Sequence, residues 1–259
     1  MSAESPDWPR VKACPRLGDD EIHVWKVGID GTDSVRWALA LLSEDERGRA
    51  AGFARERDRR RFALTRAALR VLLAGYLGRS PRELVLACGR GGKPRLAEAR
   101  LRFNVSHSGT LALLAFAFDR EIGVDLEEER ELPDALCIAR RFFAPAERRA
   151  LASLAEAEVI PAFFRCWTRK EAFIKATGGG LSHPLDSFEV SFARADEPAP
   201  LLRVRGTPRE TAPFRLAPLS PGPRFAGALA AEGDLGPISR YCLETVECLE
   251  SSGCDGGPC

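Results

Sequence analysis

The chain has 259 residues, of which 45% are hydrophobic, so it can bury one large core or two smaller ones and is too apolar to be disordered. Its 38 basic residues nearly balance its 37 acidic residues, which argues against a function organised by attraction to nucleic acid or anionic lipid. The first residues carry acid and proline instead of a signal peptide, and no run reaches membrane-spanning length, so we expect a cytoplasmic protein.

After a leader at residues 1–20, the sequence predicts a first α/β half at residues 21–110. Ser43 and Glu46 have the spacing of a capping box, which predicts the start of a helical region. The expected elements are a strand at 23–29, a helical region at 43–77 with a break near Gly48 or Gly52, a strand at 84–87, a turn at 89–94 and a strand ending near Val105.

A second α/β half is predicted at residues 111–235. Two apolar runs, at 111–118 and 122–126, flank a short polar segment and so predict a β-hairpin. The later expected elements are helices at 145–156 and 161–177, the second ended by Gly178, and strands at 188–192, 201–204, 214–217 and 225–230. A C-terminal extension follows at 236–259, and we expect its last residues to be disordered. This order predicts an α+β fold of two halves packed together.

Two carboxylates lie on the second apolar run. Asp125 and Glu127 are two residues apart, so in a strand they share a face, and free carboxylates there are costly unless they pair or bind a cation. The alternative is that the strand ends at Asp125 and the acidic run to Glu131 is solvated. The spacing alone leaves both interpretations open.

A second group of charges lies on the predicted helix at 161–177. Glu171 and Lys175 share a helical face, where they could form an ordinary surface ion pair or face a phosphate. Only five of the 38 basic residues are lysines, and three of these, Lys93, Lys170 and Lys175, lie in or beside the unusual segments. An ammonium is a compact charge that a guanidinium does not replace, which favours a chemical role for these lysines.

Three further features are ambiguous when taken singly. His107 follows a strand in a serine-rich turn, where a hydrogen-bonded loop histidine is as common as a ligand. Residues 91–94 lack the spacing of a P-loop and could form a plain turn. The arginine-rich stretch 55–61 has interleaved acids, which indicates a solvated helix face, and its best functional use would be a local anion site.

Taken together, these segments resemble the 4′-phosphopantetheinyl transferases of the large, surfactin-synthetase-activating type. The resemblance covers about residues 20–235 and leaves out the leader and the cysteine-bearing tail. Its motifs occur in the family's order: Gly92-Lys93-Pro94, Phe103 to Ser108, Gly123 to Glu127, Trp167 to Leu181 and Pro184 to Phe188, after a helix around Arg66.

The resemblance implies a pseudo-twofold monomer whose active site lies in the cleft between two similar halves. It implies coenzyme A as substrate and Mg²⁺, which Mn²⁺ can replace, held by Asp125, Glu127 and Glu171 together with the pyrophosphate. It assigns Lys175 and His107 to the phosphate oxygens of coenzyme A, Lys93, Pro94 and Ser106 to the adenosine end, and Arg66 with Arg47 or Arg49 to the 3′-phosphate. Lys170 is also counted among the coenzyme-binding residues.

The implied reaction moves the phosphopantetheine arm of coenzyme A onto a serine of an apo carrier protein and releases 3′,5′-ADP, with Glu171 as the base and Lys175 assisting. The carriers would serve peptide, polyketide or fatty-acid synthesis. A metal-dependent nuclease or phosphatase would use the same carboxylates but does not explain the other motifs. An RNA-binding module on residues 55–61 would need interleaved aromatic residues and a basic net charge, which the chain lacks.

Overall fold

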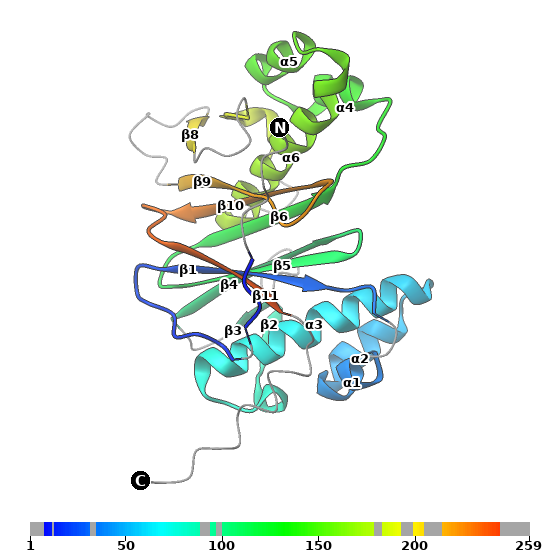
Figure 1. Ribbon diagram of the computed structural model, residues 1–259, viewed down its shortest axis with the longest axis vertical. Helices are drawn as coiled ribbons and strands as arrows, with labels where there is room; N and C mark the ends of the chain where they lie inside the picture. The colour runs from blue at the N-terminus through cyan, green and yellow to red at the C-terminus, as the bar shows by residue number, and fades with distance from the viewer. Residues whose placement is uncertain are drawn as a thin grey trace.

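The computed structural model describes residues 8–11, 13–31, 35–88, 94–96, 100–178, 183–192, 199–204 and 214–243. Within these ranges the chain forms four layers, in the order helices, sheet, sheet, helices (Figure 1). The α+β class predicted from the sequence is confirmed. Each half consists of one sheet with one long helix packed on its outer face, and two short helices lie against each long helix.

The helices of the two halves follow the same plan. They are α1 (Val35–Leu41), α2 (Glu44–Ala51) and α3 (Glu56–Leu77) in the first half, and α4 (Ala135–Phe142), α5 (Pro145–Ala152) and α6 (Glu156–Thr177) in the second, with 3₁₀ turns η1 (Pro81–Glu83) and η4 (Leu185–Ser187). The capping box is confirmed, because Ser43 Oγ accepts from Glu46 N while the Glu46 carboxylate accepts from Ser43 N. The predicted break is confirmed at Gly52. Helices α1 and α4 were not predicted, and α6 begins at Glu156, before Pro161.

Each half has its own mainly antiparallel sheet. The first sheet has the order β11 (Ile238–Leu243), β1 (Ile22–Gly28), β5 (Leu111–Phe118) and β4 (Leu101–Ser108). The second has the order β6 (Ile122–Glu128), β10 (Phe225–Glu232), β9 (Phe214–Leu219), β8 (Ala199–Val204) and β7 (Phe188–Val190). A short ribbon pairs β2 (Leu86–Cys88) with β3 (Pro94–Leu96).

The predicted hairpin of residues 111–118 and 122–126 is wrong. Strand β5 pairs with β1 and β4, whereas β6 pairs with β10, so the short link between them carries the chain from one sheet to the other. The sheets therefore divide the chain after Phe118 and not at residue 110. Strand β11, which falls in the predicted extension, completes the first sheet by pairing in parallel with β1.

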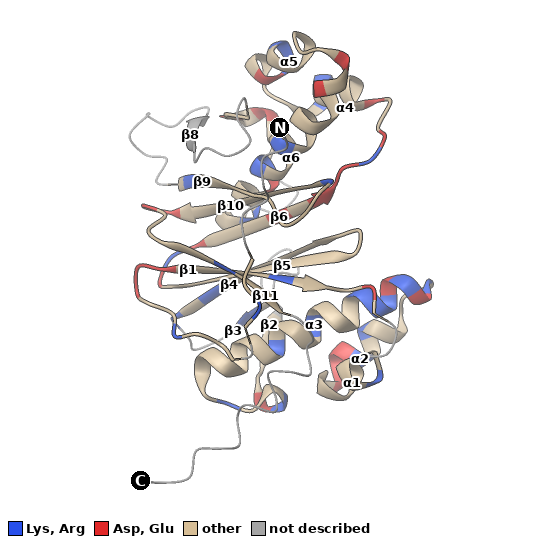
Figure 2. Ribbon diagram, in the orientation of Figure 1, with Lys and Arg blue, Asp and Glu red and all other residues tan. Residues whose placement is uncertain are grey.

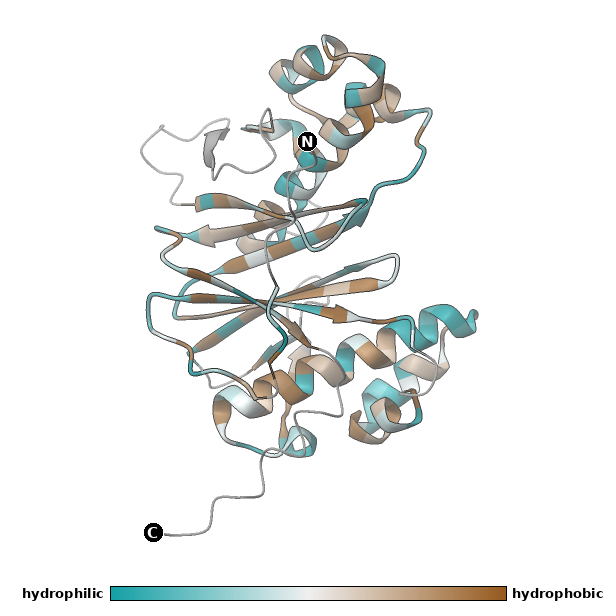
Figure 3. Ribbon diagram, in the orientation of Figure 1, coloured by the Kyte–Doolittle hydropathy of each residue, from teal (hydrophilic) through white to brown (hydrophobic). Residues whose placement is uncertain are grey.

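Three apolar clusters hold the layers together. One lies between α3 and the first sheet, one between α6 and the second sheet, and one between the two sheets (Figure 3). The third includes Val124 and Leu126 of β6 and Leu113 and Ala115 of β5. This packing fixes the edges of the two sheets relative to each other. Among the described helices, none combines the length and hydropathy needed to cross a membrane.

The described part of the leader is tied to both halves. Trp8 Nε1 donates a hydrogen bond to Ser220 O at 3.0 Å, and the Trp8 ring joins the cluster between the sheets. Next to it, Cys242 N donates to Pro9 O, and Arg10 forms a β-bridge with Cys242. Residues 8–11 of the leader are thus part of the folded structure. The tail expected to be disordered lies, from residue 244, outside the described residues.

Candidate active site

The candidate site lies where strand β6 packs against helix α6. Strand alternation sends Val124 and Leu126 into the core between the sheets, while Gly123, Asp125 and Glu127 face the helix. Gly123 makes this close packing feasible, because a Cβ there would lie 2.1 Å from the backbone oxygen of Ala172. The carboxylates of β6 are therefore held directly beneath the helix that carries Glu171 and Lys175.

Lys175 joins both halves at this point. Its Nζ donates hydrogen bonds to Asp125 Oδ1 at 2.7 Å, to Ser106 Oγ at 2.8 Å and to Val124 O at 3.3 Å. Ser106, which lies on β4 of the first sheet, in turn donates to Asp125 Oδ1 at 2.9 Å. Lys175 thus does more than form a plain surface pair with Glu171, because it also binds β4 and β6.

Glu127 and Glu171 lie in an electrostatic environment that disfavours their charged forms. Desolvation raises the pKa of Glu171, the negative charges of Asp125 and Glu127 raise it further, and Lys175 partly offsets this. Desolvation also raises the pKa of Glu127, which the charge of Asp125 adds to and the hydrogen bond from Ser108 opposes. The two groups bind protons more readily than ordinary glutamates, as expected of carboxylates that face one another.

The donor set of these three acids fits a hard cation. Asp125 is buried, and its Oδ2 has no hydrogen-bond partner among the residues that the structure describes, so one carboxylate oxygen beside the site is unsatisfied there. Within the described residues, however, no three Asp, Glu, His or Cys side chains are close enough together to form a ready-made cage. In proteins, Mg²⁺ is commonly bound through one or two carboxylates together with substrate phosphates.

His107 lies within β4 and not in a turn, so the sequence-based assignment of this segment is wrong. The strand runs on to Ser108 and presents His107 at the surface. Desolvation lowers the pKa of His107, and the positive charges of Lys175 and Arg61 lower it further. The charges of Lys175 on α6 and Arg61 on α3 both act on His107, while the carboxylate of Asp58 opposes them.

Arg61 was not singled out from the sequence, although it belongs to the stretch 55–61 for which an anion site was the best functional use. Basic residues gather at this end of α3 (Figure 2). The charge of Arg61, on the first turns of α3, acts on His107 of β4, and the spacing of residues in the sequence does not reveal this long-range interaction.

The arginines assigned to the 3′-phosphate have protein partners in the structure. Arg66 Nε lies 3.6 Å from Glu46 Oε1, and the guanidinium groups of Arg66 and Arg49 both lie over the ring of Phe62. Arg47 donates instead to the backbone oxygen of Leu42. The structure thus brings Arg49 and Arg66 together at the ring of Phe62, whereas Arg47 binds the backbone.

The assignment of Lys170 to coenzyme A is wrong. Its side chain is completely buried, and Nζ donates to Leu185 O at 2.8 Å and to Phe188 O at 2.7 Å. The same ammonium lies 2.8 Å from Glu147 Oε2, a carboxylate that is itself only 2% exposed. Lys170 lies on α6 away from Lys175 and ties α6 to α5 and to the start of β7.

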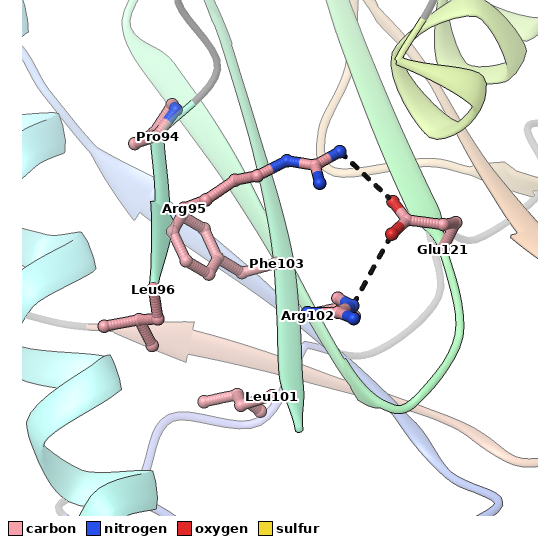
Figure 4. A pocket seen from close by; sticks show the side chains of 7 residues that line it. All are labelled: Pro94, Arg95, Leu96, Leu101, Arg102, Phe103 and Glu121. Carbon is pink, nitrogen blue, oxygen red and sulfur yellow. Dashed lines mark ion pairs between the residues drawn. The ribbon is translucent and has the colours of Figure 1, made fainter. Parts of the chain in front are cut away.

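Pro94 begins β3 and borders a pocket, whereas Lys93 lies outside the described residues. Arg95 and Arg102 extend toward Glu121 from the two sides of this pocket (Figure 4), with N to O distances of 3.9 and 3.5 Å. The pocket is lined by Pro94, Arg95, Leu96, Leu101, Arg102, Phe103 and Glu121.

Two family models match consecutive parts of the chain. A model described as "4'-phosphopantetheinyl transferase, N-terminal" matches residues 31–118, and the "4'-phosphopantetheinyl transferase superfamily" model matches residues 121–217. The two matches meet where the chain passes from β5 to β6 and so changes sheet.

Full-length relatives agree with these models. The 4'-phosphopantetheinyl transferase HetI of Nostoc is 40% identical over 223 residues, which cover 84% of this chain and 90% of the relative. The chain belongs to the 4′-phosphopantetheinyl transferase family. The transferase Sfp of Bacillus subtilis is 32% identical over 59% of this chain and 67% of its own length, and a phosphopantetheinyl transferase of Thraustochytrium is 29% identical over 90% and 88%.

The family predicted from the sequence motifs is therefore confirmed, as is the activity class. The protein is a phosphopantetheinyl transferase, an enzyme that uses coenzyme A and a carrier protein. The nuclease and RNA-binding hypotheses are set aside, because neither class corresponds to the family models that match the two halves.

Proposed function

We propose that this phosphopantetheinyl transferase moves the phosphopantetheine arm of coenzyme A onto a serine hydroxyl of an apo carrier protein, releases 3′,5′-ADP and requires Mg²⁺. The observation that carries the proposal is a group of charged side chains between β6 and α6, next to the edge of the first sheet: Lys175, Asp125, Glu127 and Glu171. Acidic oxygens beside a single ammonium match a substrate that brings a metal-bound pyrophosphate.

Asp125, Glu127 and Glu171 are the residues proposed to hold the metal. The unsatisfied Oδ2 of Asp125 and the raised pKa values of the two glutamates support this assignment, because each would be relieved by a cation. Bound there, Mg²⁺ would neutralise charge on the pyrophosphate.

The chemical step is a transfer between two oxygens. The carrier serine oxygen attacks the phosphorus that bears the pantetheine arm, and the bond from that phosphorus to the 3′,5′-ADP oxygen breaks. Glu171 accepts the serine proton, directly or through water, and its raised pKa suits this role near neutral pH. Lys175 and His107 hold the phosphate oxygens, and the ammonium of Lys175 stabilises the negative charge on the departing ADP.

Other residues are proposed to hold the ends of coenzyme A. Arg61, whose charge acts on His107, is added to the phosphate-binding set. Arg49 and Arg66 remain the candidates for the 3′-phosphate, and Arg47 is the weakest of the three. Lys93 and Pro94 are proposed for the adenosine end. Ser106 is better suited to holding Asp125 and Lys175, to which it is bonded.

The proposal also covers the carrier proteins, the oligomeric state and the localisation of the enzyme. We propose a cytoplasmic monomer that modifies acyl, aryl or peptidyl carriers of peptide, polyketide or fatty-acid synthases. A monomer is favoured because both halves of one chain contribute to the site: Ser106 of the first half binds Asp125 and Lys175 of the second.

A panel of apo carrier proteins tests the proposed function. We expect a cognate carrier to gain the mass of one phosphopantetheine, measured on the intact protein, only when coenzyme A and a divalent metal are both present. Mutation of the acceptor serine of the carrier to alanine is the control and should prevent the gain. Undiminished transfer in excess chelator would remove the metal from the proposal.

The variant Glu171→Gln separates catalysis from folding. We expect at least a hundredfold loss of transfer, because a general base contributes about 10²–10⁴-fold. In contrast, the melting temperature of the metal-free variant should rise at neutral pH by about 2 °C, since a desolvated charge facing Asp125 and Glu127 is removed.

The pH dependence of this gain follows from the raised pKa. Folded wild-type protein holds a proton on Glu171 more readily than the unfolded chain, so its stability falls as pH rises from the ordinary glutamate value of 4.5 through the folded value. The gain in Glu171→Gln should therefore shrink as pH is lowered toward 4.5. Glu131→Gln, at an exposed position of the acidic run, is the matched control. A lower melting temperature for Glu171→Gln at neutral pH would contradict the electrostatic description.

A further inference from the structure

Side-chain hydrogen bonds join the edges of the two sheets, and we call this row of contacts between β4 and β6 the seam. Strands β4 and β6 are both edge strands, since β4 pairs only with β5 and β6 only with β10 among the described strands. Asn104 Oδ1 accepts a hydrogen bond from Val124 N at 2.8 Å, so a side chain of the first sheet satisfies a backbone donor at the edge of the second.

The bonds along the seam follow the pleat of β4. Asn104, Ser106 and Ser108 are two residues apart and so point to the same face of the strand. Ser106 Oγ donates to Asp125 Oδ1, and Ser108 Oγ donates to Glu127 Oε2, both at 2.9 Å. Successive side chains of the first sheet thus reach the two carboxylates of the second.

Ser108 has a particularly constrained geometry. Its Oγ accepts a hydrogen bond from Glu128 N at 3.1 Å, which leaves its single O–H proton directed at Glu127 Oε2. The following residue, Gly109, has φ 57° and lies so close to Glu128 that an added Cβ would be 2.4 Å from Oε2. The turn after Ser108 is therefore packed against the end of β6, and the hydroxyl has little freedom to move.

Within the described part of the chain, Glu127 has a second and weaker partner. Arg130 Nη1 lies 3.5 Å from Glu127 Oε2, but its side chain is 60% exposed, and ion pairs of exposed side chains contribute little. The bond from Ser108 is shorter and comes from a half-buried strand position. Ser108 is thus the partner that can set the orientation of this carboxylate.

We propose that Ser108 is a positioning residue: through it the first sheet fixes the Glu127 carboxylate in the orientation that the metal requires. The inference rests on the proposed metal-binding function. Outer hydrogen bonds to a ligand typically change metal affinity by about 10–100-fold when they are lost. Ser108 would therefore act on metal affinity, without touching coenzyme A or the carrier serine.

Direct binding of Mn²⁺ in the presence of coenzyme A, followed by the electron paramagnetic resonance signal of the free ion, tests the proposal. We expect Ser108→Ala to bind Mn²⁺ about tenfold more weakly than wild type, and Ser108→Thr, which keeps the hydroxyl, to bind normally. Half-saturating Mg²⁺ for transfer should shift in the same way. Ser239→Ala, which removes a serine bond to Glu21 in the first sheet, is the matched control and should bind Mn²⁺ as wild type does.

The outcomes distinguish this inference from the function on which it rests. Wild-type affinity in Ser108→Ala would overturn the positioning role and leave the metal site intact. Equal weakening in Ser108→Ala and Ser108→Thr, or weakening that only follows a lowered melting temperature, would show a structural role and also overturn it. Failure of the wild-type protein to bind Mn²⁺ would refute the metal assignment itself, and this inference with it.

Discussion

Replacing Lys170 with methionine is expected to lower the free energy of unfolding by about 3–5 kcal/mol, because one partner of a buried ion pair would be left without its counter-charge. Glu147 would keep its bonds from Val190 N and Ala144 N but would lose the ammonium at 2.8 Å. Desolvation already raises the pKa of Glu147 even with Lys170 present. Urea unfolding measures the loss.

The loss should depend on pH in a defined direction. Without Lys170, folded Glu147 would hold a proton that the unfolded chain releases, so the variant loses stability as pH rises above the ordinary glutamate value of 4.5. The deficit is therefore smallest in acid and largest at alkaline pH. Adding Glu147→Gln to Lys170→Met should recover part of the stability, since the amide keeps an acceptor oxygen without the buried charge.

This experiment also decides between a structural and a catalytic role for Lys170. Lys26→Met, which removes a bond to Pro221 O, is the matched lysine control and should cost about 1 kcal/mol. If Lys170→Met kept wild-type stability and instead raised the KM for coenzyme A, the sequence-based assignment would be correct and the structural one wrong.

Local signals in the sequence predicted local structure well. The capping box of Ser43 and Glu46, the interruption at Gly52 and the end of α6 before Gly178 all depend on contacts a few residues apart. Helix α4 has only eight residues and was missed, although Asp134 stands at its N-cap position. Pro161 misled the assignment of α6 because proline is also common at helix starts.

Strand partners were less predictable, because they depend on contacts far apart in the chain. Strands β5 and β6 are adjacent in sequence and apolar, which is equally typical of a hairpin and of two strands in different sheets. The apolar face of β6 packs on the first sheet while its glycine faces α6, and only the tertiary structure shows this. Strand β11 joins β1 across almost the whole chain, and no local signal specifies that partner.

Within the site, residue types were predicted more reliably than roles. The same-face argument for Asp125 and Glu127 holds, because both point toward α6. Lysine scarcity selected Lys175, which contacts Asp125 and Ser106, but it also selected the buried Lys170. A compact ammonium also serves where two backbone oxygens and a buried carboxylate must share one cation. The role of Ser108 requires the register between two edge strands, which the sequence does not contain.

The variant Gly123→Ala is expected to lose both stability and activity, although it adds only one methyl group. The new Cβ would lie 2.1 Å from Ala172 O and 2.4 Å from Ala176 N, and both contacts are to the backbone of a buried helix that cannot rotate away. Overpacking of this kind costs about 1–3 kcal/mol and occasionally more, and we expect the upper end, about 3 kcal/mol or more, in urea unfolding.

Activity should fall further than the loss of folded protein explains. Relief of the clash must move β6 away from α6, and these two elements carry the carboxylates on one side and Glu171 and Lys175 on the other. A displacement of about 1 Å between reacting groups can cost about a hundredfold in rate, so kcat per folded molecule should fall by about that factor. The bond from Lys175 to Asp125 at 2.7 Å would be among the first contacts stretched.

Gly48→Ala provides the matched control for this effect. A Cβ at Gly48 meets no atom within 4 Å, and the residue lies inside α2, where alanine is favoured over glycine by about 0.5–1 kcal/mol. We therefore expect Gly48→Ala to be neutral or stabilising and to keep full activity. Wild-type stability and rate in Gly123→Ala would mean that β6 and α6 can separate without disturbing the site. The position of the carboxylates would then not depend on backbone contact between strand and helix.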